Sequence, residues 1–267
     1  MATNRPVALV TGASSGVGKE TARAFATAGF EVIGTARNTA PAGVTYLDLD
    51  VTSNESVDSA VKQVIDRFGR IDVLVNNAGV GANGAAEEFS VARTHEVFDV
   101  NVYGIMRMTK AVLPHMRTQR RGRVINVSSL SGFVPSPFMA IYTSTKHAVE
   151  GYSGSLDHEV REHGVRILLV EPGPINTPFG DHSVQGDTLL PLYASGRRNF
   201  DEVLAKNLSG GDDPATVAKV ILAAATDKNP KLRRTAGSTA AGISAFHRVL
   251  PARIFDRIVR KFNRMPN

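Results

Sequence analysis

Apolar and polar positions along the chain alternate between two kinds of segment. Short runs rich in Val, Ile and Leu are bounded by Gly, Pro, Asn or Asp, and they predict strands that are buried on both faces. We expect these strands at 7–11, 31–36, 44–48, 72–76, 123–127 and 165–171. Longer segments, in which apolar residues recur with the helical period, lie between or after them, at 16–28, 54–68, 90–117, 142–163 and 213–225.

Strands that alternate with helices of this length form βαβ units around a parallel sheet. Glycine follows four of the helical segments, in or soon after the position where helices end, at Gly29, Gly69, Gly122 and Gly164. No internal repeat, low-complexity stretch or long linker divides the chain. We therefore expect an α/β fold with a single doubly wound parallel sheet and helices on both faces. This Rossmann fold would cover residues 1–226, and 227–267 would be a C-terminal helical extension of the same domain.

Composition narrows the class of protein. Of the 267 residues, 42% are apolar and 21% are charged, as in an ordinary soluble globular domain. Cysteine is absent, which excludes disulfides, thiolate metal ligands and a cysteine nucleophile, and we predict no metal site. The sequence has no apolar run of ~18 residues and no signal-peptide core near Met1, so we expect a cytoplasmic protein.

The formal net charge of +6 is concentrated in one segment. Residues 227–267 hold ten basic and two acidic side chains, a net +8, which leaves −2 for residues 1–226. A slightly acidic body argues against a nucleic-acid-binding surface over the main fold. We therefore expect no nucleic acid among the partners.

Apolar residues in this basic tail recur at helical spacing, at Ile254, Phe255, Ile258, Val259, Phe262 and Met265. Arginine and lysine side chains lie between them, a pattern that predicts an amphipathic basic helix. One interpretation is peripheral contact with an anionic membrane. The other is a helix that packs its apolar face on the domain or on a second subunit.

A glycine-rich turn follows the first predicted strand. The chain there is Thr11-Gly12-Ala13-Ser14-Ser15-Gly16-Val17-Gly18, and a helix begins within it. Such a turn presents backbone N–H groups and the positive end of a helix to a pyrophosphate, and a Cβ at the glycines would obstruct the approach. A tight turn that binds nothing is the alternative, but the position after the first strand favours a dinucleotide site.

The spacing Gly-x-x-x-Gly-x-Gly resembles that of the short-chain dehydrogenase/reductase family. Further motifs of the family follow in order: Asn76-Asn77-Ala78-Gly79, Asn101, Ser128-Ser129, Tyr142-Thr143-Ser144-Thr145-Lys146, Pro172-Gly173 and Thr177. Together they extend the resemblance over residues 5–225. The glycine turn, Arg37 and the long tail are also similar to the hydroxysteroid and retinol dehydrogenase branch.

The resemblance implies a catalytic set of Asn101, Ser129, Tyr142 and Lys146. Tyr142 and Lys146 stand four residues apart at a helix start, so their side chains share a face. A free tyrosine has a pKa of ~10, which an adjacent ammonium lowers. By resemblance, Tyr142 exchanges a proton with the substrate oxygen, while Lys146 holds the nicotinamide ribose and lowers the tyrosine pKa. Ser129 would hydrogen-bond the carbonyl oxygen, with Ser128 as its competitor. Asn101 would anchor a water in a proton relay, or bond only to backbone.

The resemblance also implies the residues that contact the cofactor. Those at the pyrophosphate are Gly12, Ser14, Ser15, Gly16, Val17 and Gly18. Those at the adenine side are Asp50, Val51, Asn77, Ala78 and Gly79. Those at the nicotinamide side are Tyr142, Lys146, Pro172, Gly173, Ile175 and Thr177. A helix cap is the alternative role for Asp50, and a plain loop is the alternative for Pro172-Gly173.

The residue type at the end of the second strand indicates whether the site prefers NAD or NADP. An NAD site typically has Asp or Glu there, ~20 residues after the glycine turn, to bind the ribose 2′-hydroxyl. Here the strand ends Thr35-Ala36-Arg37-Asn38, and no acid occurs from Val32 to Leu47. The guanidinium of Arg37 suits a 2′-phosphate instead, although a surface arginine without a ligand is the alternative. We predict that NADP(H) is preferred over NAD(H).

Two predominantly apolar segments would flank the substrate, residues 130–141 and a candidate lid over 179–200. In that lid, Arg197 would meet an anionic end of the substrate or be solvated. We predict an NADP(H)-dependent oxidoreductase that transfers a hydride between nicotinamide and a carbonyl or secondary alcohol of a hydrophobic steroid-, retinoid- or lipid-like substrate.

Two other functions predict sequence features that differ from those of this chain. A non-catalytic NADP-binding sensor or scaffold would have lost Tyr142 or Lys146. A sugar-nucleotide epimerase would have Gly-x-x-Gly-x-x-Gly and a longer C-terminal domain. Helices 90–117 and 142–163 resemble those that build the family's dimer, so we expect a homodimer or homotetramer.

Overall fold

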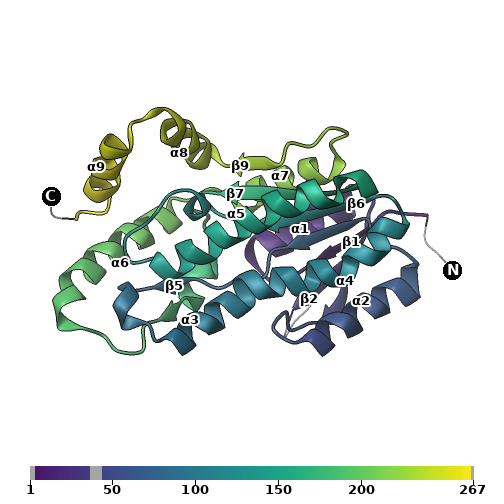
Figure 1. The fold of residues 1–267 in the computed structure, drawn as a ribbon, viewed down its shortest axis with the longest axis horizontal. Helices are drawn as coiled ribbons and strands as arrows, with labels where there is room; N and C mark the ends of the chain where they lie inside the picture. The colour runs from purple at the N-terminus through teal and green to yellow at the C-terminus, as the bar shows by residue number, and fades with distance from the viewer. Residues whose placement is uncertain (1–3, 37–43, 266–267) are drawn as a thin grey trace.

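Seven parallel strands form the central sheet of the protein, which the computed structural model describes over residues 4–36 and 44–265 (Figure 1). The strands are β1 (Val7–Val10), β2 (Glu31–Ala36), β3 (Thr45–Asp48), β4 (Val73–Asn76), β6 (Gly122–Val127), β7 (Val165–Pro172) and β9 (Arg233–Ala236). Their order is β3-β2-β1-β4-β6-β7-β9, with every neighbouring pair parallel. The chain winds outward in both directions from β1 and β4, which confirms the doubly wound Rossmann fold. Ligands of such sheets bind at the carboxyl ends of the strands, beside this switch point.

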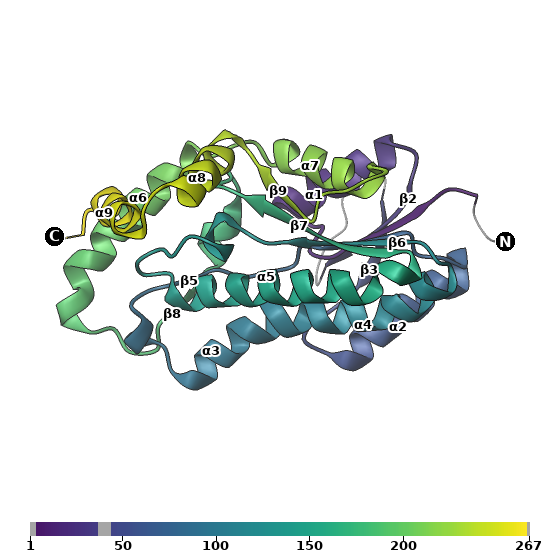
Figure 2. The ribbon, with the colours of Figure 1, turned by 45° about the horizontal axis from the view of Figure 1, so that its top comes forward.

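Helices cover both faces of the sheet (Figures 1 and 2). On one face α1 (Gly16–Thr27) packs with α7 (Pro214–Thr226), and the other carries α2 (Asn54–Phe68), α4 (Gly104–Thr118) and α5 (Ala140–Val160). Successive residues of β1 belong to opposite cores: Val7 and Leu9 to the core with α2 and α4, Ala8 and Val10 to the core with α1 and α7. Side chains of a strand alternate between its faces, so a doubly covered strand has no polar face.

Local signals fix the ends of several helices where the sequence predicts them. The hydroxyl of Ser53 accepts a hydrogen bond from the Ser56 backbone N–H and caps α2, which ends at Gly69 with a φ of 74°. The carboxylate of Asp213 caps α7 by accepting from the Ala215 N–H at 2.7 Å. The predicted helix 90–117 is interrupted: α3 (Val91–Phe98) and α4 are joined by a π-helical turn at Asp99–Tyr103.

Three features of the fold are absent from the sequence prediction. These are the edge strand β9, the helix α6 (Ala194–Ser209), and the two-residue strands β5 (Ala82–Asn83) and β8 (Val184–Gln185), which pair with each other. The sheet therefore continues past residue 226, where the predicted extension begins. Strand β9 was missed because three of its four residues are polar, which an edge strand tolerates.

Two helices, α8 (Ser238–Val249) and α9 (Ala252–Phe262), follow the last strand and lie at one end of the molecule (Figures 1 and 2). They confirm the predicted C-terminal helical extension. In the part of the chain that the structure describes, no helix has the length and apolar character needed to cross a bilayer.

Candidate functional site

The glycine-rich turn leaves β1 at the switch point of the sheet. Gly12 has a φ of 64°, and a Cβ there would lie 2.9 Å from Ala78 Cα. Gly18 is equally constrained, because its Cβ would overlap the carbonyl oxygen of Gly12. These glycines therefore keep the turn, the helix start and the loop after β4 in close contact.

Hydrogen bonds lock this turn to the loop after β4. The side-chain amide of Asn77 donates to the carbonyl oxygens of Thr11 and Gly12, both at 3.0 Å. In return the Thr11 hydroxyl oxygen accepts from the backbone N–H groups of Asn77 and Ala78, also at 3.0 Å. The predicted residues Asn77 and Ala78 thus hold the glycine turn in shape.

The N-terminus of α1 is a cradle for an anion. Ser15 is its N-cap residue but makes no side-chain capping bond, and the first turn carries no acid, so the positive end of the helix is not neutralised there. Ser14 and Ser15 are exposed, and Val17 is half-buried. The Thr177 side chain lies against the turn, because a Cβ added at Gly16 would be 3.2 Å from the methyl carbon of Thr177. This arrangement fits a dinucleotide pyrophosphate.

Tyr142, Lys146 and Ser129 meet at the start of α5. Tyr142 and Lys146 are one helical turn apart, and each is 7% exposed. The ammonium nitrogen of Lys146 lies 5.6 Å from the Tyr142 ring centroid and donates to the carbonyl oxygen of Val127 at 2.9 Å. The Ser129 side chain is a hydrogen-bond partner of the phenol. Ser128 is turned elsewhere: its buried hydroxyl makes no hydrogen bond within the described residues and lies beside Gly132.

The pKa values of this group differ from the expectation. Burial raises the pKa of Tyr142 to about 12, although the bond with Ser129 opposes the rise. Burial also lowers the pKa of Lys146 to about 8, against the attraction of Glu150. The expected lowering of the tyrosine pKa by Lys146 is therefore not seen: burial is the largest effect on Tyr142, and the ammonium is directed at the Val127 carbonyl. A phenol that keeps its proton at neutral pH can donate it.

Asn101 lies in the π-helical turn between α3 and α4 and is fully buried. Its side-chain oxygen accepts from the Val80 N–H at 2.8 Å, and its amide donates to the Val80 carbonyl at 2.9 Å and to the Thr145 hydroxyl at 3.2 Å. Gly79 lies beside it, since a Cβ there would be 3.2 Å from the amide oxygen. Asn101 thus joins the loop after β4 to the helix that carries Tyr142.

The predicted adenine-side residues Asp50 and Val51 end the loop after β3. The carboxylate of Asp50 accepts from the backbone N–H of Thr52 at 2.9 Å and from its hydroxyl at 2.8 Å. Val51 is buried and packs against Gly104 of α4. Arg37, on which the cofactor preference depends, lies outside the described residues.

The segment after β7 leads from the sheet to the glycine turn. Pro172 is the last residue of β7, and the Gly173 N–H donates to the carbonyl oxygen of Ala236 in β9. Ile175 is buried and Thr177 caps a short helical turn that begins at Pro178. The predicted nicotinamide-side residues in 172–177 thus lie between the sheet and the start of the candidate lid, whereas Tyr142 and Lys146 lie on α5.

A buried carboxylate ties that lid to the body. Glu88, whose side chain is fully buried, ion-pairs with Arg197 of α6 and accepts from the Leu190 N–H at 2.8 Å and the Ala85 N–H at 3.0 Å. Burial alone would raise the pKa of Glu88, but the two N–H groups and the guanidinium lower it. Arg197 is therefore paired within the protein rather than solvated. Sequence reasoning missed Glu88 because no motif marks it.

Aromatic rings gather between Tyr142 and the lid. The Phe179 ring lies 5.9 Å from that of Tyr142, and the Phe138 ring lies 6.3 Å from Tyr193 and 5.9 Å from Phe200. Phe138 has a φ of 58°, a strained value for a bulky residue. The two segments predicted to flank the substrate, 130–141 and 179–200, thus meet through apolar rings.

Comparison with known proteins identifies the family. The sequence model of the short chain dehydrogenase family matches residues 6–187. The chain belongs to the short-chain dehydrogenase/reductase family. It is 38% identical over 235 residues to 3-ketodihydrosphingosine reductase of Bacteroides thetaiotaomicron, covering 86% of this chain and 87% of that protein. It is 36% identical over 258 residues to retinol dehydrogenase 8 of Bos taurus, covering 85% and 80%.

Solved structures of short-chain dehydrogenases agree with this assignment. One from Streptomyces avermitilis has a TM-score of 0.81 at 36% identity and covers 92% of this chain and 93% of its own. One from Burkholderia phymatum, in complex with NAD, has a TM-score of 0.80 at 26% identity over 93% and 94%. A metagenomic short-chain oxidoreductase, in complex with NADP, has a TM-score of 0.68 at 29% identity over 86% and 96%. The chain is therefore an oxidoreductase whose family binds a nicotinamide cofactor.

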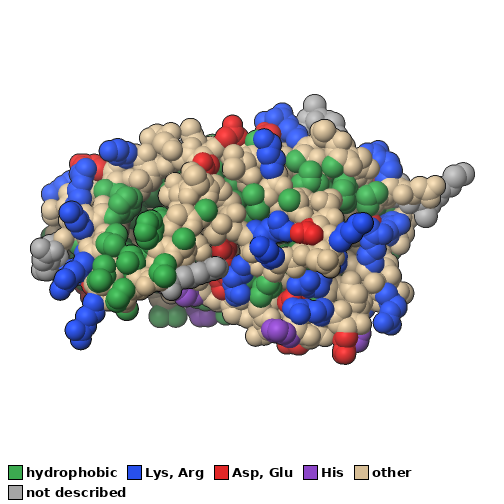
Figure 3. All heavy atoms as spheres, turned by 90° about the horizontal axis from the view of Figure 1, so that it is seen from above, with side chains coloured by type: hydrophobic (Ala, Val, Ile, Leu, Met, Phe, Trp, Pro, Cys, Tyr) green, Lys and Arg blue, Asp and Glu red, His purple; other side chains and the backbone are tan. Residues whose placement is uncertain are grey.

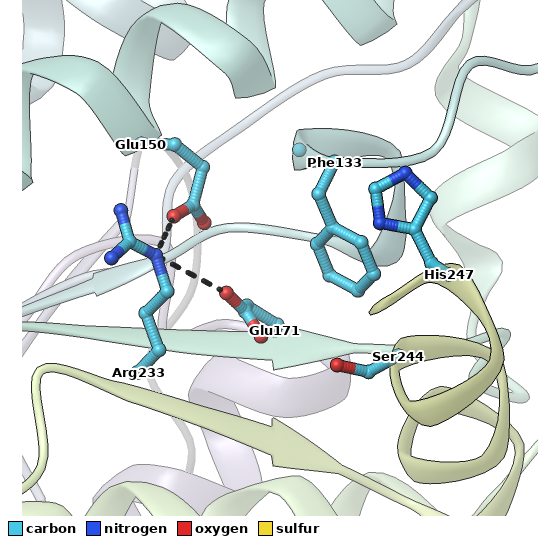
Figure 4. A pocket seen from close by; sticks show the side chains of 7 residues that line it. Phe133, Glu150, Glu171, Arg233, Ser244 and His247 are labelled. Carbon is cyan, nitrogen blue, oxygen red and sulfur yellow. Dashed lines mark hydrogen bonds and ion pairs between the residues drawn. The ribbon is translucent and has the colours of Figure 1, made fainter. Parts of the chain in front are cut away.

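A cavity of about 190 Å³ lies beside α5 of this short-chain dehydrogenase (Figure 4). Arg233 of β9 reaches into it and pairs with Glu150 at 2.8 Å and with Glu171 at 3.7 Å. His247 of α8 faces Phe133 across the same cavity, with ring centroids 5.8 Å apart. The C-terminal extension is thus joined to the helix that carries Tyr142 and Lys146.

Proposed function

We propose that this short-chain dehydrogenase is an NADP(H)-dependent carbonyl reductase, or the corresponding alcohol dehydrogenase, for a hydrophobic substrate. The observation that carries the proposal is the buried Tyr142 phenol with Ser129 on one side and Lys146 on the other. Its position at the carboxyl edge of the sheet, beside the anion cradle of α1, is where a bound nicotinamide and a substrate would meet.

Each residue of the set has a role that its environment suits. When bound, NADPH supplies the hydride that reduces a substrate carbonyl carbon. Tyr142, protonated at neutral pH because its pKa is about 12, donates its proton to the carbonyl oxygen. Ser129 donates a hydrogen bond to that oxygen as negative charge develops. Lys146 binds the nicotinamide ribose hydroxyls and stabilises the phenolate that remains.

The protonation state of Tyr142 at neutral pH suits the acid role that carbonyl reduction requires. Reduction needs the phenol as an acid, which is its dominant form far below a pKa of about 12. Alcohol oxidation needs the phenolate as a base, which this buried site disfavours. A relay through Asn101 would return a proton to Tyr142 after each turnover.

The preference for NADP(H) is supported by the sequence at the end of β2. No acid occurs from Val32 to Leu47 to bind a ribose 2′-hydroxyl, and Arg37 follows the last residue of the strand. The guanidinium would pair with the 2′-phosphate. We expect kcat/KM with NADPH to exceed that with NADH, and Arg37→Leu to reduce this ratio. A higher kcat/KM for NADH in the unmodified enzyme would refute the assignment.

The substrate class is supported by the rings beside Tyr142. Phe179, which is 37% exposed beside Tyr142, and the half-buried Phe138 offer apolar area to a large hydrophobic carbonyl, and the lid arginine Arg197 is already paired with Glu88. Two similar proteins are named for a sphingoid ketone and for retinol. We therefore propose a long-chain, retinoid or steroid carbonyl as the substrate.

A substrate panel tests the function. NADPH consumption is followed with 3-ketodihydrosphingosine, retinal, a ketosteroid and short aliphatic ketones, and we expect turnover with at least one hydrophobic carbonyl. Tyr142→Phe should abolish it while NADPH binding persists. Tyr103→Phe, at a partly exposed tyrosine of the π-helical turn, is the matched control. NADPH binding without turnover of any compound would favour a non-catalytic sensor instead.

Assembly and location complete the proposal. We infer a homodimer or homotetramer in which α4 and α5 pair with their counterparts, as their likeness to the family's dimer helices suggests. Light scattering coupled to size exclusion should give a mass of two or four chains, and a monomer would refute this.

The absence of cysteine is compatible with a reducing cytoplasm, which fractionation of the native host would test.

A further inference from the structure

The last helix of the chain, α9, exposes one apolar flank beside a basic one. Phe255, Val259 and Asn263 face the body, where the Phe255 ring lies 5.0 Å from that of His247 and Asn263 is buried. Ile254, Ile258 and Phe262, spaced four residues apart, remain 45%, 48% and 59% exposed. The helix is therefore already seated on the protein, and this second apolar stripe has no partner in the described chain.

The neighbouring helix enlarges the apolar surface. Phe246 and Val249 of α8 are 62% and 79% exposed. Figure 3 shows hydrophobic side chains gathered over α8 and α9, with Lys and Arg side chains beside them. We call the five exposed side chains the tail patch: Phe246, Val249, Ile254, Ile258 and Phe262. Soluble monomers rarely leave a contiguous apolar surface of this kind uncovered.

The charge beside the tail patch indicates its partner. Arg253, Arg257 and Lys261 are exposed on the flank of α9 that adjoins the apolar stripe. No carboxylate of the described residues forms an ion pair with any of the three. Residues 238–265, which include α8 and α9, hold six basic side chains and one acidic side chain, a net +5. A partner that covers this surface must therefore be apolar beneath a layer of negative charge.

We propose that the tail patch docks the protein on the surface of an anionic lipid bilayer. The apolar stripe would enter the boundary between headgroups and acyl chains, and Arg253, Arg257 and Lys261 would remain among the anionic headgroups. A second copy of the chain fits this surface less well, because it would add the same three basic side chains to the interface and no additional apolar layer beneath negative charge.

The docking surface is connected to the segment that covers the site. Arg264, just after α9, forms an ion pair with Glu202 of α6 at 2.9 Å. Helix α6 also carries Arg197 and Phe200, which contact Glu88 and Phe138. Docking would therefore hold the lid beside the bilayer, where a lipid-like substrate resides; this last step rests on the proposed function, but the docking itself does not.

Sedimentation of the full-length protein with vesicles tests the proposal without any need for turnover. We expect the protein to pellet with phosphatidylcholine vesicles that contain roughly one third phosphatidylserine, and far less with phosphatidylcholine alone. Ile258→Ser/Phe262→Ser should lower the partition coefficient about tenfold, since two partly exposed apolar side chains lose their burial in the bilayer. Val91→Ser, at an apolar residue of α3 that is 75% exposed, should leave it unchanged.

A charge variant provides the second arm of the test. Arg253→Gln/Arg257→Gln/Lys261→Gln should lower the partition coefficient about a hundredfold, at about 1 kcal/mol per basic residue. The control Lys62→Gln/Arg67→Gln/Lys219→Gln removes the same charge from α2 and α7, outside the proposed dimer helices, and should have a small effect. All six side chains are exposed, so folding is preserved.

Three results would overturn the proposal. They are failure to pellet with the anionic vesicles at physiological salt, equal losses in the tail and control variants, and self-association that the Ile258→Ser/Phe262→Ser variant abolishes while vesicle binding persists. The last would assign the tail patch to a second copy of the chain. Because pelleting is measured without substrate, failure of docking leaves the proposed reaction intact, and an inactive enzyme that pellets leaves docking intact.

Discussion

The ammonium nitrogen of Lys146 lies 5.6 Å from the ring centroid of Tyr142, and the carbonyl of Val127 at 2.9 Å fixes its direction. Both side chains are buried, and burial moves their pKa values in opposite directions, to about 12 for Tyr142 and about 8 for Lys146. In each case the neutral form is favoured. The pair therefore couples the stability of the fold to pH.

The free energy of unfolding should rise between pH 8 and pH 10. In this range the unfolded chain keeps the Lys146 proton, with its ordinary pKa of 10.5, while the folded chain has released it. The full shift corresponds to about 3 kcal/mol. Above pH 10 the sign reverses, because folded Tyr142 retains a proton that the unfolded chain loses. Urea unfolding across this range measures the effect.

Lys146→Met should remove the rise in the free energy of unfolding between pH 8 and pH 10, because no ammonium is then buried below pH 8. Lys62→Met, at an exposed lysine of α2, should retain it. If the wild type and Lys146→Met show the same pH slope, Lys146 does not titrate near pH 8 in the folded chain.

The glycine turn yields a second prediction. Gly12→Ala forces an alanine to a φ of 64° with its Cβ 2.9 Å from Ala78 Cα. We expect it to lower the free energy of unfolding by about 1–3 kcal/mol. NADPH affinity should fall at least about tenfold, because a displaced turn loses aligned N–H groups worth about 1.4 kcal/mol or more. Thermal unfolding and fluorescence titration with NADPH are the measurements.

Gly242→Ala is the matched control for this substitution. Gly242 lies in the interior of α8, and a Cβ there meets nothing within 4 Å. Alanine in a helix interior should raise the free energy of unfolding by about 0.5–1 kcal/mol and leave NADPH binding unchanged. Equal NADPH affinity in the Gly12 and Gly242 variants would mean that the turn does not hold the cofactor.

The sequence predicts the central sheet well because burial on both faces leaves a strong local signal. Strands such as β1 and β7 are continuous apolar runs, whereas β9 is held by pairing with β7 and by the bond between Arg233 and Glu150. Helix α6 likewise depends on partners far away in the chain, since Arg197 pairs with Glu88. Such long-range pairs have no periodicity that a single sequence reveals.

In the candidate site, too, local sequence predicts some features while long-range packing determines others. The motifs indicate Ser129, Tyr142 and Lys146, and these three side chains meet in the structure. The pKa of Tyr142 could not be inferred from its spacing to Lys146, because the result depends on how deeply the phenol is buried and on where the ammonium points. Local sequence specifies which groups are near, and packing decides their protonation.

Glu88 gives a third prediction, on the lid. Glu88→Gln keeps the shape of the side chain but removes the charge that Arg197 pairs with. We expect a loss of about 2–3 kcal/mol in the free energy of unfolding, the scale of a hydrogen bond to a charged group. The KM for the carbonyl substrate should rise more than kcat falls, since the lid is positioned before the chemical step.

Arg198→Gln is the control for this change, because Arg198 is the exposed neighbour of Arg197 on the same helix. It should leave both KM and stability near their wild-type values. Urea unfolding and steady-state kinetics provide the two readouts. An unchanged KM in Glu88→Gln would show that the ion pair does not position the lid.

Asn101 gives the last prediction, which separates a structural role from one in proton transfer. All three of its described hydrogen bonds end on Val80 or Thr145, and Thr145 in turn donates to the carbonyl oxygen of Tyr142 at 2.7 Å. Asn101→Ala should cost about 2–3 kcal/mol, because it leaves the part-buried N–H and carbonyl groups of Val80 without their partner. Thr145→Val removes two bonds, the one from Asn101 and the one to Tyr142, and should cost about 1–2 kcal/mol.

Asn101→Ala and Thr145→Val should differ in kcat if Asn101 also supports a proton relay. The kcat of Asn101→Ala should then fall at least about tenfold below that of Thr145→Val, a difference of about 1.4 kcal/mol in activation free energy. Its solvent deuterium isotope effect should rise, because proton return to Tyr142 becomes slower. NADPH affinity should change less than kcat in both, as neither side chain contacts the glycine turn itself. Equal kcat values and equal isotope effects would limit Asn101 to holding the loop after β4 against α5.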